Sequence, residues 1–273
     1  MAETAGGILI EADALRREIE QGEMPVVIDA RQPAEYAKGH IPGAVSFSTY
    51  DIFALDTRPD GLASFAREMG TRYLGAGVSN LRTAVVYDED TGMRAAREAW
   101  ILQFLGHAQV RLLHGGFAAW RAAGCNVSAQ PSDDWTVAFH VRERPGFAIG
   151  WDEIAGRLGS SGFTLLDVRD ADEHAGRDKT TCCARRGCIP GSVHIEWTEF
   201  FERVRFKSPE AIRGLLDERG MDLGLEFVPY CHRGARSAAA YYALCHAGVA
   251  RVRNYIGSWH EWSARSELPI EKG

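Results

Sequence analysis

The sequence predicts an α/β fold with two homologous domains, each a mostly parallel sheet flanked by helices. Short apolar runs alternate with helical patterns, which is typical of parallel strands covered by helices. The chain also repeats itself once, with matching segments about 140 residues apart, and a repeat of that length indicates two domains rather than a solenoid. A chain of 273 residues fits two domains of ordinary size.

Four pairs of segments carry the repeat: 27–31 with 165–169, 39–45 with 187–193, 84–88 with 227–231, and 115–120 with 257–262. A polar stretch with prolines and aspartates, 126–146, lies between the two copies and is typical of a linker. We therefore expect a first domain over 1–124, a linker over 125–146 and a second domain over 147–273.

Within the first domain the patterns predict strands over 8–10, 26–29, 83–87 and 110–113, a capped helix over 13–20 and a helix over 93–105. The second domain repeats this order, with a strand over 225–230 and a helix over 237–246. Pro229 is an exception, because proline cannot donate to a sheet ladder. The strand is expected to be unpaired on that side or to contain a bulge.

Charge and hydropathy exclude several classes of function. The 31 basic and 37 acidic residues are mixed along the chain and give a net charge of −6, so we expect neither a nucleic-acid nor a membrane partner. No apolar run approaches the roughly 18 residues that span a bilayer, and the acidic N-terminus has no signal-peptide pattern. Six cysteines in a chain this long do not form a disulfide framework. These features predict a cytoplasmic protein.

One cysteine, Cys231, lies between the strand over 225–230 and the helix over 237–246. Backbone N–H groups converge at a helix N-terminus, where the helix dipole favours negative charge. Both effects favour a thiolate, and the cations Arg233 and Arg236 act in the same direction. Gly234 allows the backbone to curl around an anion. The sequence thus predicts a nucleophilic cysteine in an anion-binding loop.

These segments resemble the rhodanese superfamily in its tandem-domain sulfurtransferase arrangement. The resemblance rests on Asp-x-Arg at 29–31 and 167–169, Gly-His-Ile-Pro-Gly-Ala at 39–44, the Cys231 loop, and Gly-Ser-Trp-His-Glu-Trp at 257–262. It implies two rhodanese-like domains and a transferase that needs no metal or organic cofactor. It also implies that Cys231 is the catalytic nucleophile, which carries sulfur as a persulfide in two covalent steps. Asp88 stands where the first domain would need a thiol, so that domain is expected to be an inactive structural partner.

Two features of the loop narrow the chemistry. Phosphatases on related folds resemble Cys-x5-Arg, whereas Cys231 and Arg236 give Cys-x4-Arg, which suits a single sulfur better and makes phosphatase activity a minor alternative. Thiosulfate-type loops resemble Cys-Arg-Lys-Gly, and mercaptopyruvate-type loops resemble the uncharged Cys-Gly-Ser-Gly. His232 and Arg233 therefore favour thiosulfate, a small dianion.

The expected reaction moves sulfane sulfur from thiosulfate, or a similar anionic donor, to cyanide or a thiol. The residues expected to bind the donor are Arg177, His232, Arg233, Gly234, Ala235 and Arg236, with Arg177 assigned from the resemblance. Two alternatives remain: a 3-mercaptopyruvate sulfurtransferase, and a sulfur-relay or sensor protein whose acceptor is another protein.

The segment 182–188 contains Cys182, Cys183 and Cys188. Adjacent cysteines have poor ligand geometry and no Cys-x2-Cys pair occurs, so no metal site is expected; a redox switch is an alternative to a plain surface loop. Arg185 and Arg186 are candidates for a positive rim around the site.

Three further expectations concern residues outside this segment. Asp167 and Arg169 are expected to form hydrogen bonds at a strand end, and Arg169 is expected to pair with Glu173. His260 is expected either to approach the site or to pack among aromatic residues.

Overall fold

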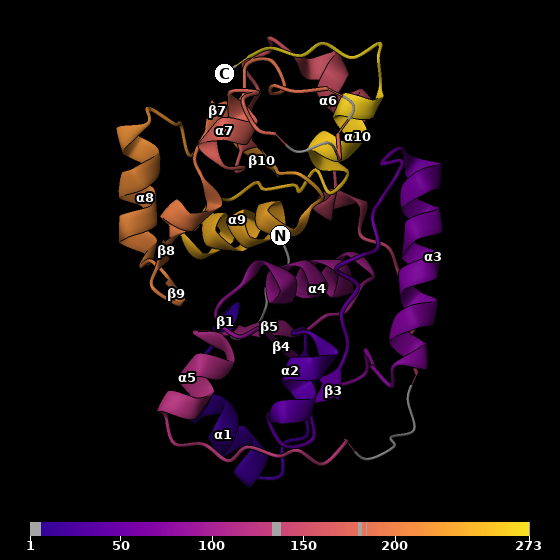
Figure 1. The fold of residues 1–273 in the computed structure, drawn as a ribbon, viewed down its shortest axis with the longest axis vertical. Coiled ribbons are helices and arrows are strands. Elements are labelled where there is room, and N and C mark those ends of the chain that lie inside the picture. Colours follow the sequence, from indigo (N-terminus) through magenta and orange to yellow (C-terminus); the bar gives the residue numbers. More distant parts are fainter. Residues whose placement is uncertain (1–6, 133–137, 180–181, 184, 273) are drawn as a thin grey trace. The chain divides into compact units, whose positions relative to one another are not determined.

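The computed structural model describes residues 7–132, 138–179, 182–183 and 185–272. It contains two compact units (Figure 1). Unit 1 comprises Met1–Ile52, Phe65–Arg144 and Arg203–Phe206, and unit 2 comprises Phe53–Ser64, Pro145–Glu202 and Lys207–Gly273. The segment Phe53–Ser64 therefore belongs to unit 2, although it lies in the first half of the chain. The domain limits at 124 and 147 stay a prediction, and residues 133–137 of the expected linker lie outside the described residues.

Among the described residues, unit 1 contains a five-stranded sheet in the order β1-β5-β4-β2-β3, in which every neighbouring pair is parallel. Its strands are β1 (Leu9–Ile10), β2 (Val26–Asp29), β3 (Val45–Ser46), β4 (Ala84–Tyr87) and β5 (Val110–Leu113). The helices in this half of the chain are α1 (Ala12–Glu20), α2 (Pro33–Lys38), α3 (Pro59–Gly75), α4 (Met93–Phe104) and α5 (Gly116–Ala122). The parallel α/β architecture is confirmed.

The central strands of unit 1 are buried in the way that is typical of a parallel sheet. Every residue of β2 and β4 is buried, as expected when helices cover both faces of a parallel sheet. The predicted cap of α1 is wrong. Its N-cap residue, Glu11, makes no side-chain capping hydrogen bond, so α1 is stabilised by packing of Ala12 and Leu15 rather than by a cap.

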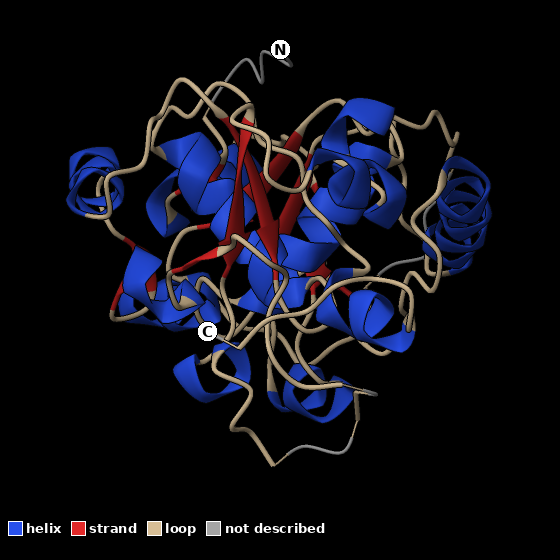
Figure 2. Cartoon of the chain, turned by 90° about the horizontal axis from the view of Figure 1, so that it is seen from above, coloured by secondary structure: helices blue, strands red, loops and turns tan. Residues whose placement is uncertain are grey.

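Among the described residues, unit 2 contains a three-stranded sheet in the order β10-β6-β7, again with parallel pairs. Its strands are β6 (Phe163–Asp167), β7 (Val193–His194) and β10 (Glu226–Tyr230), and the shorter strand β8 (Phe201–Glu202) lies outside this sheet. The short strand β9 (Arg205–Phe206) comes from the segment that belongs to unit 1. The helices are α6 (Trp151–Arg157), α7 (Ala171–His174), α8 (Pro209–Glu218), α9 (Ala235–His246) and α10 (Ser258–Ala264), with 3-10 turns at Pro145–Phe147 and Trp197–Phe200. Figure 2 shows strands lying among helices.

Pro229 occupies a position of β10 where its missing N–H costs little. The backbone polar groups of alternate residues of β10 point towards β6. Those of Phe227 and Pro229 point towards the segment 251–255 instead. On that side Phe227 N–H donates to Arg251 O, and Tyr255 N–H donates to Pro229 O. Pairing there is limited to these bonds, an Arg253 N–H bond to Phe227 O and one isolated bridge between Phe227 and Val252. Proline thus stands on the partly paired edge of the strand, which is the first of the two expected solutions.

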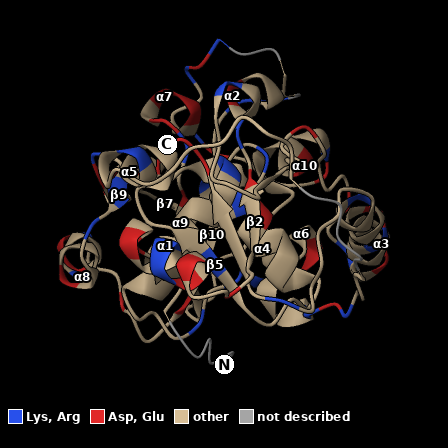
Figure 3. Ribbon diagram, turned by 90° about the horizontal axis from the view of Figure 1, so that it is seen from below, with Lys and Arg blue, Asp and Glu red and all other residues tan. Residues whose placement is uncertain are grey.

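Helix α9 positions the candidate site. It begins at Ala235, two residues before the predicted start, because the loop closes at Gly234 and enters the helix directly. Ala238 to Leu244 are all buried, and a helix that is apolar all round belongs in a core. None of the described helices is long and apolar enough to cross a membrane. Figure 3 shows acidic and basic residues together on α1, in line with the mixed charge of the chain.

Candidate active site

Cys231 directly follows β10 and stands in the turn that leads into α9. The residue is 1% exposed, and its Sγ accepts a hydrogen bond of 3.1 Å from the N–H of Gly234. Gly234 has a φ of +87°, and a Cβ there would lie 2.7 Å from the carbonyl oxygen of Ile256. Glycine is therefore required for the turn that aims an N–H at the sulfur.

Ser258 supports the same cysteine from the start of α10. Its Oγ accepts the Cys231 N–H at 3.1 Å and donates to the Tyr255 carbonyl at 2.8 Å. Ser258 has a φ of +56°, a left-handed conformation that costs a non-glycine residue of order 1–3 kcal/mol. Sequence patterns did not single out this serine, because its role depends on a contact between residues 27 positions apart.

The electrostatic environment favours the thiolate. Burial raises the pKa of Cys231, but the Arg236 charge and N–H groups of Ser237 and Arg233 outweigh it and lower the pKa below that of an ordinary thiol. This is the expected behaviour of a cysteine at a helix N-terminus beside a cation. The Cys231 thiolate is therefore available at a lower pH than that of a typical cysteine.

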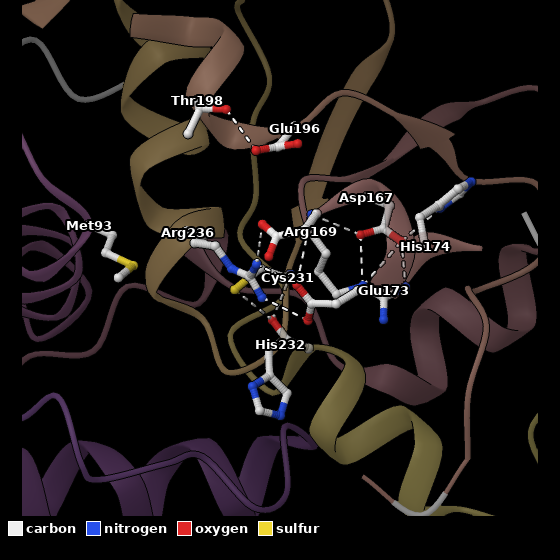
Figure 4. A network of polar contacts seen from close by, with 12 residues as sticks. Met93, Asp167, Arg169, Glu173, His174, Glu196, Thr198, Cys231, His232 and Arg236 are labelled. Atoms are coloured by element: carbon white, nitrogen blue, oxygen red, sulfur yellow. Dashed lines mark hydrogen bonds and ion pairs between the residues drawn. The ribbon is translucent and has the colours of Figure 1, made fainter. Parts of the chain in front are cut away.

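Arg236 is held by carboxylates on the other side of its guanidinium (Figure 4). It donates to Glu173 through two bonds of 2.5 and 2.9 Å and to Asp170 at 3.0 Å. The expectation that Glu173 pairs with Arg169 is thus wrong. Arg169 is buried and binds Asp167 at 2.6 Å and the Gly187 carbonyl at 2.8 Å, so Glu173 is left for Arg236.

Arg233 has a different environment from that of Arg236. Its guanidinium carbon lies 4.3 Å from the centre of the Phe53 ring, a cation–π distance. Among the described residues no carboxylate forms an ion pair with Arg233, and its buried Nε has no hydrogen-bond partner. Arg233 is thus the loop cation whose charge is not neutralised by an ion pair within the described chain.

The His232 ring points away from the network around Arg236 (Figure 4). Its Nε2 lies 3.2 Å from Sγ of Cys182. Burial, together with the nearby Arg233, lowers the His232 pKa to about 4, so the imidazole is neutral at physiological pH. His260 lies close as well, with ring centres 6.1 Å apart and its N–H donating to the His232 carbonyl at 3.0 Å. His260 therefore reaches the loop rather than serving only in aromatic packing.

The remaining candidate cations lie in other environments. Arg177 is exposed and forms an ion pair of 3.0 Å with Asp172; its predicted role in donor binding stays a prediction. Arg185 is not a free rim cation, because it donates to the carbonyls of Trp262, Ser263, Leu268 and Arg265 at the end of α10. Arg186 is exposed. Ala184, in the same segment, lies outside the described residues.

A buried Asp-Arg-Tyr cluster underlies the site in unit 2 and recurs in unit 1. In unit 2, Asp167 accepts from Arg169 at 2.6 Å and from the Tyr230 hydroxyl at 2.8 Å. In unit 1 the corresponding bonds, from Arg31 and Tyr87 to Asp29, are both 2.6 Å. Each tyrosine oxygen also accepts an N–H, from Ile189 and Ile41 respectively. The structural reading of the Asp-x-Arg motifs is therefore confirmed.

Asp88 occupies the position in unit 1 that Cys231 occupies in unit 2. Its carboxylate accepts the N–H groups of Glu89 at 2.9 Å and Arg94 at 3.2 Å. Burial raises the pKa of Asp88. The loop N–H groups of unit 1 are thus bound to a side chain of the protein itself, and a carboxylate cannot accept sulfane sulfur.

A family model described as "Rhodanese-like domain" matches residues 11–123 and 151–265. The chain belongs to the rhodanese family. Its repeat is therefore a pair of rhodanese-like domains, as the resemblance implied. The chain is 30% identical to the thiosulfate sulfurtransferase of Azotobacter vinelandii over 97% of both chains. It is 32% identical to that of Corynebacterium glutamicum, covering 97% of this chain and 90% of the relative. It is 29% identical to the 3-mercaptopyruvate sulfurtransferase of Escherichia coli strain K12, covering 96% and 97%.

Solved structures share the fold of this chain. An anaerobic ergothioneine biosynthesis enzyme from Chlorobium limicola, in complex with trimethyl histidine, matches 97% of this chain and 70% of its own with a TM-score of 0.84. At 24% sequence identity this likeness shows the fold alone. The described structure brings Cys231, Gly234 and Arg236 of the loop together with Ser258, which the sequence analysis did not single out, and with Glu173, which was expected to pair with Arg169.

Proposed function

We propose that this sulfurtransferase takes sulfane sulfur from thiosulfate and passes it to a thiol or to cyanide through a persulfide on Cys231. The observation that carries the proposal is the position of the Cys231 Sγ, 3.1 Å from the Gly234 N–H at the start of α9. Arg236 and the loop N–H groups lower the pKa of this thiol. A thiolate in that position is the nucleophile that such a reaction needs.

In the first step the Cys231 thiolate attacks the outer sulfur of thiosulfate. The S–S bond of the donor breaks and sulfite leaves with the bonding electron pair, so no proton is transferred. The product is a negatively charged persulfide on Cys231, which the N–H groups and the Arg236 charge stabilise. In the second step the acceptor attacks the outer sulfur and the thiolate leaves, which regenerates Cys231. With cyanide the product is thiocyanate.

The environment of Arg233 supports the proposal of an anionic donor. Its guanidinium lies over Phe53 and is not paired with a carboxylate among the described residues, whereas Arg236 is neutralised by Glu173 and Asp170. We assign donor binding to Arg233 with the N–H groups of Gly234 and Ala235, charge stabilisation to Arg236, and outer contacts to Arg177 and His232. A cation with no ion-pair partner attracts a dianion more strongly than a neutral loop would.

The first test replaces the nucleophile. Cys231→Ser is expected to abolish thiosulfate-dependent formation of thiocyanate from cyanide, because a serine hydroxyl cannot form a persulfide. Asp88→Ala is the matched variant at the corresponding position of unit 1 and is expected to retain most activity, with its folding checked by thermal melting. Residual transfer by Cys231→Ser would refute the mechanism.

The relative named 3-mercaptopyruvate sulfurtransferase supports a second donor. Measuring kcat/KM for thiosulfate and mercaptopyruvate on one preparation decides between them, and we expect thiosulfate to be preferred. Arg233→Gln should raise KM for thiosulfate by about tenfold, the effect of losing one charge-assisted contact of 1.4 kcal/mol. A clear preference for mercaptopyruvate, or an unchanged KM in Arg233→Gln, would overturn the charge argument.

The acceptor and the location belong to the same proposal. A protein thiol is an alternative acceptor, and it would be favoured by slow turnover with every small donor together with a stable Cys231 persulfide in intact-mass measurements.

We propose a cytoplasmic location, which the free state of all six cysteines in the described structure supports.

A further inference from the structure

We propose that Cys182, Cys183 and His232 form a binding site for Zn²⁺ beside the nucleophile loop. The inference is independent of the sulfur donor, since it rests on three ligand groups that the fold brings together. The Sγ atoms of the two cysteines and a ring nitrogen of His232 all lie within 4.8 Å of one another. Two thiolates and an imidazole are ligands that Zn²⁺ prefers.

The distances between these atoms match tetrahedral coordination. Zn–S bonds of about 2.3 Å place two sulfur ligands about 3.8 Å apart in a tetrahedral site, and the Sγ atoms of Cys182 and Cys183 are 3.8 Å apart. With a Zn–N bond of about 2.1 Å the sulfur-to-nitrogen separation is about 3.6 Å, compared with 3.2 Å between Cys182 and His232. A small rotation of the imidazole closes that difference.

The expectation that adjacent cysteines cannot share a metal came from sequence spacing alone. In the structure the two residues lie in a bend, and the third ligand comes from a residue 50 positions away. A ring nitrogen of histidine is the commonest metal ligand in proteins, and the Nε2 atom of His232 lies 3.2 Å from Sγ of Cys182. Three protein ligands leave a fourth position open to water or to a small thiol, and Cys182 is exposed to solvent.

Described residues near the ligands form hydrogen bonds with other parts of unit 2. After the cysteines, Arg185 donates to four carbonyls around the end of α10, and its own carbonyl accepts Trp259 Nε1–H at 3.2 Å. Cys188 then pairs with Glu271 through N–H···O bonds of 2.8 and 3.0 Å. On the other side, the His232 carbonyl accepts the His260 N–H. The three ligand atoms thus lie within 4.8 Å of one another before any metal binds, and such proximity lowers the entropic cost of binding.

The site also has a consequence for the loop. His232 is the residue next to Cys231, so a metal held by its imidazole restrains the side chain that neighbours the nucleophile. We expect Zn²⁺ to inhibit sulfur transfer reversibly, with recovery on addition of a chelator. Inhibition through His232 differs from direct binding of the metal to Cys231, and cysteine variants distinguish the two cases.

The experiment is titration of the reduced full-length protein with Co²⁺, followed by competition with Zn²⁺. We expect one equivalent of Co²⁺ to give sulfur-to-cobalt charge-transfer absorption and the intense visible bands of tetrahedral cobalt, both removed by Zn²⁺. Cys182→Ser and Cys183→Ser should weaken binding at least about tenfold, the effect of losing one ligand contact of roughly 1.4 kcal/mol. Cys125→Ser and Cys245→Ser are the matched controls and should bind as the natural protein does.

Two further measurements make the result decisive. Cys231→Ser should keep the cobalt spectrum; loss of the spectrum in that variant, with retention in Cys182→Ser, would assign the metal to the nucleophile and refute the proposal. In the natural protein Zn²⁺ should protect Cys182 and Cys183 from alkylation, as mapped by mass spectrometry, which does not depend on the folding of any variant. Absence of charge-transfer absorption and of protection would leave only a thiol–imidazole hydrogen bond and overturn the inference.

Discussion

Two arginines of the nucleophile loop have different electrostatic partners. Arg236 is 14% exposed and shared between Glu173 and Asp170. Burial lowers the pKa of Arg236, but the hydrogen bond to Glu173 and the negative charges around it outweigh burial and keep the guanidinium charged. Arg233 stacks on Phe53 and has no carboxylate partner among the described residues. The charge of Arg236 acts on the sulfur from a fixed position, whereas that of Arg233 is available to a ligand. The sequence shows two equal cations, and only the fold separates them.

A change at Arg236 should alter the Cys231 pKa. Arg236→Met removes the cation that lowers this pKa, so the pKa should rise towards that of an ordinary buried thiol. The fraction of thiolate at pH 7 then falls and sulfur transfer slows. Glu173→Gln should lower the Cys231 pKa further, because it leaves the Arg236 charge less neutralised. The rate of alkylation of Cys231 by iodoacetamide as a function of pH measures both shifts. Equal pKa values in the two variants would contradict the assignment.

At the level of elements, the junction between β6 and α7 couples a histidine to the buried Asp-Arg-Tyr cluster. The ring of His174 lies 2.9 Å from Asp167 and stacks on His194 with ring centres 4.7 Å apart. The hydrogen bond to Asp167, and then that to Cys188, raises the His174 pKa to about 9. The ion pair thus links a short helix to the end of a central strand.

The stability of this junction should depend on pH. A histidine whose pKa is raised on folding stabilises fully below its unfolded pKa of about 6.5, and the contribution is lost as pH rises to about 9. We expect this contribution to be on the order of 2 kcal/mol. The difference in melting temperature between the natural protein and His174→Gln should therefore be large at pH 6 and small above pH 9. A difference that grows with pH would contradict the sign.

The turn between β10 and α9 makes a second prediction at this scale. Gly234→Ala should lower stability by about 1–3 kcal/mol from left-handed strain alone, with a further cost from contact with Ile256, 2.7 Å from the added Cβ. Gly248→Ala is the matched control, since its φ of +85° is similar and no atom lies within 4 Å. Thermal melting and thiocyanate formation should show a larger loss for Gly234→Ala in both measurements.

The fold could largely be predicted from the sequence, because the period of apolar residues is a local signal and the internal repeat is visible in the sequence itself. The strands around 26–29 and 110–113 lie where the patterns placed them, and Cys231 follows its strand as predicted. Four features could not be found in this way: the Glu173–Arg236 pair, the Ser258 support, the Phe53 contact and the approach of His232 to Cys182. Each joins residues far apart in sequence, and in a single sequence nothing marks which distant side chains meet.

For the whole molecule, we expect unit 1 to have the rhodanese fold without the chemistry, because Asp88 stands where unit 2 has Cys231. Placing a cysteine there should not restore activity. Asp88→Cys in a Cys231→Ser background should show no thiocyanate formation above background and no persulfide by intact mass after treatment with thiosulfate. The neighbouring residues Glu89 and Asp90 are acidic, and Met93 stands where the second domain has Arg236. Sulfur transfer by this double variant would show that a thiol alone suffices.

The repeated Asp-Arg-Tyr cluster separates what makes a domain fold from what makes it react. The same buried bonds hold Asp29 with Arg31 and Tyr87 in unit 1, and Asp167 with Arg169 and Tyr230 in unit 2, although Asp88 follows the strand in unit 1 and Cys231 follows it in unit 2. The cluster is therefore compatible with either residue at the end of the strand. For protein engineering, this makes the loop over 88–94 a place to build a second and different reaction centre into the same chain.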